Sequence, residues 1–248
     1  LPKNLNFHEA AVVMRHCPTA WNLLINIAKL QAGEWALIMG ASGNLGTVGI
    51  QIAKNIVGAK VICTYHPAYL LRNPAVLAQA YAEVDRVLPG DTKPDYAQVP
   101  KLEVIERILK EALRLWPTAP SFSVAPFEDQ VVGGRYLLRK DRPVNVFTPG
   151  VHRFASVWDD AEEFDIDRWL PEAEAARHPH AYKPFGNGER ACIGRQFAMV
   201  EAKIAMAMLL RSFAISDPHS YKLRIKETLS IKPDDFWMRI RLRQRRLG

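Results

Sequence analysis

The chain has 248 residues, of which 48% are hydrophobic and 24% are charged, as in folded globular proteins and unlike disordered or collagen-like chains. Its net charge of +7 is modest and spread along the sequence, which argues against nucleic-acid binding. Its three cysteines lie far apart without a C-x-x-C pair, which disfavours structural zinc, c-type haem attachment and a disulfide framework, and favours a cytoplasmic location. We expect no membrane span and no signal peptide, because no apolar run could cross a bilayer without a charge.

The first 64 residues predict the start of a nucleotide-binding sheet. Helical spacing over 21–30 precedes a short apolar strand at 35–39, a glycine-rich turn at 40–49, a helix at 50–56 and a strand at 60–64. This order is that of a βαβ unit, in which Gly43 and Gly46 would let the turn amides approach a pyrophosphate. The strict GxGxxG fingerprint is not met, because Ala41 stands where its first glycine belongs.

The runs LQAGE at 30–34 and QIAK at 51–54 resemble the zinc-free, quinone-reductase-like branch of the medium-chain dehydrogenase/reductase superfamily. The resemblance implies NAD(P) binding. The remaining strands of that sheet do not follow, and the sequence changes character at 65–67. Residues 1–64 are therefore either a working NAD(P) site or a partial Rossmann-like segment that packs without nucleotide, and the sequence favours the second interpretation.

Residues 65–248 predict a second domain, mainly α-helical with small β-sheets. Asn73-Pro74 opens one helix, and another runs over 102–115 and ends before Pro117. Gly133-Gly134 predicts a hairpin turn, and alternation predicts strands at 144–146 and 239–246, the latter a basic edge strand. The helix that follows residue 192 is expected to carry an apolar stripe with charged residues off it. The stripe comprises Phe197, Val200, Ile204 and Met208, and the charged residues are Glu201, Lys203 and Arg211.

The run FGNGERACIG at 185–194 is the richest chemical feature of the sequence. Cys192 lies in a glycine-rich loop at the start of a helix, where the helix dipole and free amides stabilise a thiolate, an anionic ligand for iron. Gly186 and Gly194 let the backbone turn tightly and leave room for a flat ring to approach. Arg190 is placed to pair with a carboxylate on the edge of that ring.

This run resembles, position for position, the haem-binding loop of the cytochrome P-450 family, and the likeness continues over about 66–246. The resemblance implies that Cys192 is the catalytic residue and axial ligand of the haem iron. It also implies that Phe185 shields the sulfur, that Arg190 holds a haem propionate and that His152 makes a minor contact on the haem side. The expected fold is the C-terminal half of a P-450 haem domain preceded by the partial Rossmann-like segment.

Glu111 and Arg114 are three residues apart on the helix predicted over 102–115, so their side chains are neighbours on one face. Alone, they would be an ordinary exposed pair. Together with Arg168 they resemble the family's ExxR helix and its later arginine, which implies a structural charge cluster on the proximal side of the haem. Because arginine can hold a carboxylate with two hydrogen bonds, Glu111 between two arginines would fix the cysteine loop.

Two further runs, YKPF at 182–185 and IKETLSIKP at 225–233, resemble the haem domains of self-sufficient bacterial and fungal fatty-acid hydroxylases. The resemblance implies a monooxygenase that inserts one oxygen atom of O2 into a small apolar, fatty-acid-like substrate, with electrons from NADPH through a separate reductase. The family's distal acid–threonine pair is not found upstream of residue 69, so a truncated domain is expected. The alternatives are an NAD(P)H-dependent quinone or alcohol oxidoreductase and an inactive chimera or fragment.

Overall fold

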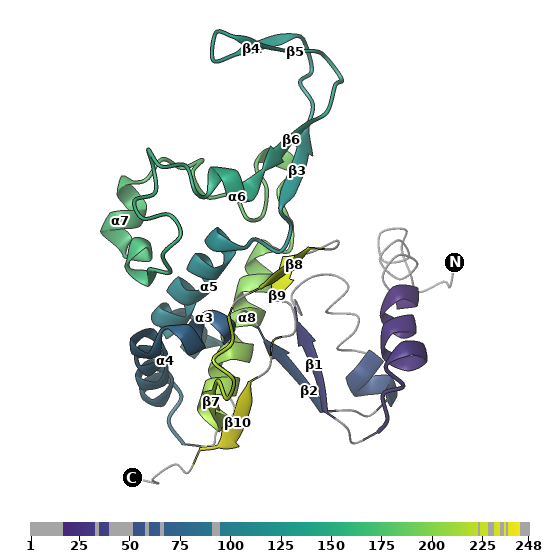
Figure 1. Ribbon diagram of the computed structural model, residues 1–248, viewed down its shortest axis with the longest axis vertical. Coiled ribbons are helices and arrows are strands. Elements are labelled where there is room, and N and C mark those ends of the chain that lie inside the picture. The colour runs from purple at the N-terminus through teal and green to yellow at the C-terminus, as the bar shows by residue number, and fades with distance from the viewer. Residues whose placement is uncertain are drawn as a thin grey trace. The chain divides into compact units, whose positions relative to one another are not determined.

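The computed structural model describes residues 17–32, 35–39, 52–57, 60–64, 67–90, 95–222, 224–227, 231–233, 236 and 238–243. It divides into two compact units, one built from residues 1–109, 194–222 and 236–248 and the other from residues 110–193 and 223–235. The division falls within helix α5 (Glu103–Leu115; labelled in Figure 1), whose residues up to Leu109 belong to the first unit. The domain boundary expected at residue 65 stays a prediction.

The N-terminal part of the first unit contains two parallel strands. β1 (Trp35–Met39) pairs with β2 (Lys60–Thr64), and helical residues Ile52–Val57 lie between them in the chain. Both strands lie at the predicted residues and pair in parallel, and the helix predicted at 50–56 overlaps the π-helical residues Ile52–Val57. Two strands do not by themselves make a dinucleotide-binding sheet, so that interpretation stays a prediction. The turn that carries Gly43 and Gly46 lies outside the described residues.

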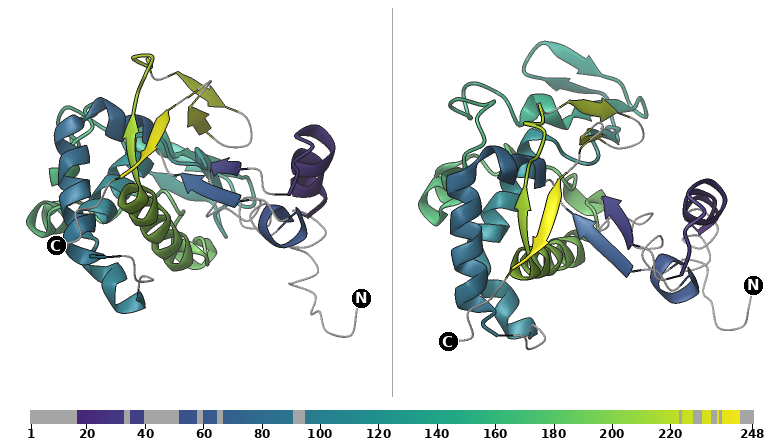
Figure 2. Two further views of the ribbon diagram at one scale, coloured as in Figure 1. Left: turned by 90° about the horizontal axis from the view of Figure 1, so that it is seen from below. Right: turned by 60° about the horizontal axis from the view of Figure 1, so that its bottom comes forward.

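The other described elements of the first unit are helices and an antiparallel strand pair. They are α3 (Pro67–Arg72), α4 (Pro74–Val87), a 3-10 helix (Tyr96–Lys101), the start of α5, α8 (Arg195–Ser212), β7 (Phe213–Ser216) and β10 (Arg239–Leu242). A π-helical turn (Asn22–Ile27) precedes β1. β10, yellow in Figure 2, lies antiparallel beside β7. The first amides of α5 donate to Glu83 of α4, whose carboxylate accepts from Val104 at 2.7 Å and Ile105 at 3.0 Å. Glu83 thus satisfies helix-terminal N–H groups that otherwise lack partners.

Helix α8 is buried on a different face from the predicted one. Lys203 and Arg211, expected off the apolar stripe, are each only 5% exposed, whereas Phe197 is 61% exposed and Met208 lies at the surface. Both buried charges have partners: Lys203 Nζ lies 2.6 Å from Glu106 Oε2, and Arg211 Nε donates to the Gly90 carbonyl. The predicted stripe was therefore wrong, because distant partners let two charged side chains enter the interior. The buried apolar residues of the helix are Ala198, Ala202, Met206, Ala207, Leu209 and Leu210.

The second unit combines short antiparallel pairs with short helices. β3 (Ser121–Val124) pairs with β6 (Val144–Phe147), β4 (Gln130–Val132) with β5 (Tyr136–Leu138), and β8 (Ile225–Glu227) with β9 (Ile231–Pro233). Its helices are the end of α5, α6 (Thr148–Val151), a 3-10 turn (Ile166–Trp169), α7 (Pro171–Ala176) and a 3-10 turn (Gly188–Arg190). The β4–β5 hairpin extends beyond β3 and β6 (Figure 1) and turns at Gly133 and Gly134, both at positive φ, as predicted.

No helix in the described part of the chain is both long and apolar enough to cross a membrane.

Candidate functional site

A buried ion pair on α5 belongs to the second unit. Glu111 and Arg114 are both 0% exposed. Arg114 Nε donates to Glu111 Oε2 and Nη2 donates to Oε1, each at 2.8 Å, so the guanidinium holds the carboxylate with two parallel hydrogen bonds. This is the geometry in which arginine binds a carboxylate most strongly.

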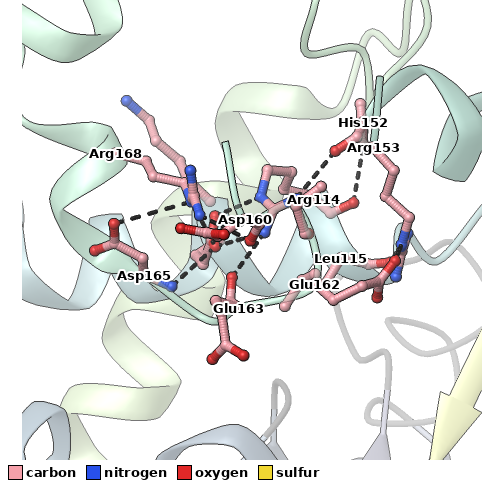
Figure 3. Close-up of polar contacts among 12 residues, drawn as sticks. Arg114, Leu115, His152, Arg153, Asp160, Glu162, Glu163, Asp165 and Arg168 are labelled. Atoms are coloured by element: carbon pink, nitrogen blue, oxygen red, sulfur yellow. Dashed lines mark hydrogen bonds and ion pairs between the residues drawn. The ribbon is translucent and has the colours of Figure 1, made fainter. Parts of the chain in front are cut away.

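Every N–H group of the Arg114 guanidinium has an acceptor (Figure 3). The three not directed at Glu111 donate to backbone carbonyls: Nη1 to His152 at 3.0 Å and Ala161 at 2.7 Å, and Nη2 to Glu163 at 3.0 Å. A guanidinium has five N–H donors, so this side chain is fully satisfied. Arg114 therefore fastens the segment after β6 to helix α5.

The Glu111 carboxylate also accepts two hydrogen bonds that the sequence did not reveal. The Asp165 amide donates to Oε1 and the Trp169 indole Nε1 donates to Oε2, each at 3.0 Å. Arg168, the third member of the predicted cluster, lies near, with Nε 3.6 Å from Glu111 Oε1, and its Nη2 donates to the Asp160 carbonyl. Arg168 Nε has no hydrogen-bond partner among the described residues. The structure thus brings the three predicted charges together, with Arg114 bonded directly and Arg168 as a longer ion pair.

Aromatic rings and a third arginine, Arg177, pack around the cluster. Arg177 Cζ lies 4.2 Å from the centre of the Trp158 ring and 4.9 Å from that of Trp169, and Arg114 Cζ lies 5.1 Å from the Trp158 ring. Burial lowers the pKa of Arg177 from its ordinary value, an effect that Glu174 and Glu111 oppose. These contacts of cations with aromatic faces add to the packing of the unit's buried core.

His152 is buried and bonded at both ring nitrogens. Its Nε2 lies 2.8 Å from the amide nitrogen of Lys183, and its Nδ1 lies 3.0 Å from the carbonyl oxygen of Arg114. A backbone amide can only donate, so Nε2 is the acceptor and Nδ1 carries the hydrogen. The ring is 0% exposed and both of its nitrogens are bonded within the protein, so the geometry does not favour a polar contact with haem. The minor haem-side contact of His152 stays a prediction.

The cysteine loop is closed by its own backbone. The Cys192 amide donates to the Phe185 carbonyl at 2.8 Å, and the Gly186 amide to the Lys183 carbonyl at 3.2 Å. Gly186 and Gly188 have φ of +76° and +63°, a backbone conformation that suits glycine. Helix α8 then begins at Arg195 with Gly194 as its N-cap.

The thiol of Cys192 is exposed, as is the neighbouring Ile193, while Phe185 is partly buried. The described residues contain no group of three or more histidine, cysteine or acidic side chains that could enclose a metal ion. The exposed thiol of Cys192 is one sulfur ligand, which fits an iron whose other ligands come from a porphyrin. Arg190 lies in the 3-10 turn before Cys192, and its side chain lies outside the described residues.

Residues 63–238 match the protein family described as Cytochrome P450. Among curated relatives, a bifunctional cytochrome P450/NADPH–P450 reductase of Bacillus cereus is 51% identical over 175 residues, which is 69% of this chain and 16% of that protein. The self-sufficient cytochrome P450 monooxygenase CYP505E3 of Aspergillus terreus is 48% identical over 178 residues, 71% of this chain and 17% of its own length. The solved heme domain of cytochrome P450DA is 55% identical with a TM-score of 0.69 and covers 71% of this chain and 39% of that one.

The chain thus spans about a sixth of the length of the curated relatives it matches. The family match begins two residues from the predicted change of character at 65. Residues 1–62 fall outside the match, and the dinucleotide-binding interpretation gains no support from it.

Proposed function

Because this chain belongs to the cytochrome P450 family, we propose that it binds haem through the Cys192 thiolate and takes part in a monooxygenase reaction. The observation that carries the proposal is the exposed thiol of Cys192 in a loop that is closed by its own backbone hydrogen bonds. We also propose residues 65–248 as the C-terminal half of a haem domain, supported by the start of the family match at residue 63.

Five residues of the loop have a proposed part in holding the cofactor. Cys192 supplies the axial sulfur, and the start of α8 three residues later stabilises its negative charge. Gly186 and Gly194 leave space for the flat ring, and Phe185 covers the sulfur from one side. Arg190 pairs with a propionate of the ring, as a guanidinium does with a carboxylate.

The cluster of Glu111, Arg114 and Arg168 has a structural part in this proposal. Its members are occupied with one another and with backbone carbonyls of the segment around residues 152–163. Because every N–H group of the Arg114 guanidinium is already bonded, we assign the cluster to fixing the scaffold that carries the cysteine loop rather than to proton transfer.

Haem bound at Cys192 would supply the activation of O2. Relatives named as fusions of a cytochrome P450 with an NADPH–P450 reductase support NADPH as the electron source, through a reductase that acts as a partner of this chain. We propose a small apolar organic molecule of fatty-acid type as the substrate.

Carbon monoxide difference spectroscopy tests haem ligation. The chain is purified, reconstituted with haem, reduced with dithionite and exposed to CO, and a red-shifted Soret band typical of thiolate ligation is expected. Cys192→Ala should lose this band, whereas the control Cys17→Ala, at a partly buried free cysteine, should keep it. A chain that shows no such band under any reconstitution condition would refute the proposal.

Turnover is tested separately from ligation. The reconstituted chain is supplied with NADPH, a soluble P450 reductase and a medium-chain fatty acid, and hydroxylated product is measured by mass spectrometry. Product that depends on Cys192 supports the monooxygenase. Haem binding without product would identify the chain as a haem-binding fragment without activity of its own.

A further inference from the structure

His152 connects the buried charge cluster to the segment that enters the cysteine loop. On one side its Nδ1–H donates to the Arg114 carbonyl, and its own carbonyl accepts from Arg114 Nη1. On the other side its Nε2 accepts from the Lys183 amide at 2.8 Å. Lys183 stands two residues before Phe185, and the Phe185 carbonyl accepts a hydrogen bond from the Cys192 amide. One imidazole ring thus links helix α5 to the entry of the loop.

Protonation of this ring would break the second link. An imidazolium donates from both nitrogens and accepts at neither, so Nε2–H would face the Lys183 N–H across 2.8 Å. The bond from Nδ1 to the Arg114 carbonyl would survive. Protonation therefore acts on the side of the ring that faces the loop.

The surroundings of the ring hold it in the neutral form. Its neighbours are two cations, Arg114 from α5 and Arg153 beside it in sequence, and the Tyr182 ring, which stacks on it at 5.1 Å between centroids. Glu111 is the nearest acidic group of the cluster, and it is engaged by Arg114. Burial, and to a lesser extent the two arginines, lower the pKa of His152 from 6.5 to about 4.

We infer that His152 is a positioning residue that fastens the Cys192 loop through the Lys183 amide while its ring is neutral, and that acid releases the loop by protonating it. This inference rests on the proposed function for its meaning, because the released segment leads to the proposed iron ligand. Tyr182 stays attached, since its hydroxyl donates to the Lys110 carbonyl at 3.1 Å. The release therefore begins at Lys183 and extends toward the loop.

The size of the effect follows from proton linkage. In the released state the ring is exposed and has its ordinary pKa, so release becomes more favourable as the pH falls through 6.5 and the gain levels off near 4. Between about pH 7.5 and about pH 5, the equilibrium constant for release should rise about 30-fold.

Amide hydrogen exchange of the whole chain, followed by mass spectrometry, measures this release without haem. After correction for the intrinsic effect of pH, the peptide covering 182–187 should lose protection by about 30-fold between about pH 7.5 and about pH 5. The peptide covering helix α4, which contains no histidine, is the internal control and should change much less. Equal behaviour of the two peptides in the unmodified chain overturns the inference, so the test does not depend on any variant folding.

Two substitutions separate the two sides of the ring. In His152→Gln the longer side chain retains an acceptor for the Lys183 amide and does not titrate, so protection at neutral pH should stay within a few-fold of the parent and not fall in acid. In His152→Asn the shorter side-chain amide reaches the Arg114 carbonyl but not the Lys183 amide. Protection of the 182–187 peptide should therefore be low at both pH values. His219→Gln, at an exposed histidine, should behave as the parent. An acid response in His152→Gln equal to that of the parent also overturns the inference.

The haem-loaded chain gives a second readout. The thiolate-type CO band should decline in acid in the parent and decline less in His152→Gln. If no CO band forms at any pH, the proposed function fails, while the exchange result still decides the role of His152.

Discussion

Replacing Glu111 by glutamine removes one charge and one acceptor from the centre of the buried cluster. The carboxylate accepts four hydrogen bonds, two from Arg114 and one each from the Asp165 amide and the Trp169 indole. In Glu111→Gln one carboxylate oxygen is replaced by an NH2 group, so two of the four N–H groups that bond to the carboxylate face a donor instead of an acceptor. The Arg114 guanidinium, itself 0% exposed, loses its bidentate counter-charge.

The cost of this change is that of leaving a buried charge unpaired, about 3–5 kcal/mol. Such a loss is a large part of the stability of a typical domain, which is about 5–15 kcal/mol. With a urea m-value of about 2–3 kcal/mol/M for a chain of this size, the midpoint of unfolding should fall by roughly 1.5 M. Tryptophan fluorescence suits the measurement, because Trp158 contacts Arg114 and Trp169 donates a hydrogen bond to Glu111.

Glu174→Gln is the matched control. Glu174 pairs with Lys110 at 2.8 Å in the same unit, but its side chain is 44% exposed. Loss of that pair should change the free energy of unfolding by less than about 1 kcal/mol. Equal shifts in the two variants would refute the reasoning, because burial and saturation of Glu111 would then carry no energetic weight.

Three further predictions concern residues outside the cluster. Tyr81→Phe removes a hydroxyl that bonds two backbone groups of β7 and should cost about 1–3 kcal/mol in urea unfolding. Glu106→Gln removes the counter-charge of the buried Lys203 and should lower the free energy of unfolding by about 2 kcal/mol more than Lys203→Met does. In Lys203→Met the remaining Glu106 carboxylate is partly exposed to water, so its charge costs less. A lower urea midpoint for Lys203→Met than for Glu106→Gln would contradict the role of burial. Gly188→Ala forces a side chain to φ of +63° and should lower stability by about 1 kcal/mol in thermal melts, whereas Gly188→Asn should cost less.

Local signals in the sequence predict most of the elements. Pro74 opens α4, Pro117 follows the end of α5, and the paired glycines at 133–134 form the turn between β4 and β5. These features depend on the conformational limits of proline and glycine, which act within a few residues and are therefore readable from sequence. The family resemblance over residues 66–246 agrees with the match to Cytochrome P450 over 63–238.

Burial of charged residues could not be read from local spacing. Lys203 and Arg211 of α8 have hydrophilic side chains at positions that helical periodicity assigns to the surface. Their partners, Glu106 and Gly90, stand 97 and 121 residues earlier, and only the folded chain brings them near. The prediction of the buried face of α8 failed for this reason.

The candidate site shows the same limit. The ExxR pattern located Glu111 and Arg114, and the resemblance to the family's later arginine located Arg168. The indole of Trp169 was missed, although Trp169 follows Arg168 in the sequence and an indole N–H needs an acceptor when buried. The His152 ring is bonded to backbone groups that lie 38 and 31 residues away in the sequence. Because every residue has a backbone carbonyl and nearly every residue has an amide, the sequence does not indicate which of them the ring contacts.

The β4–β5 hairpin has a consequence for handling the protein at high concentration. In the described part of the chain its two strands pair only with each other, and their apolar side chains Val131, Val132, Tyr136 and Leu137 are exposed. A short ribbon with open edges and apolar faces is a template for strand pairing between molecules. A lysine in place of an exposed apolar residue of β4 should therefore reduce self-association at high protein concentration.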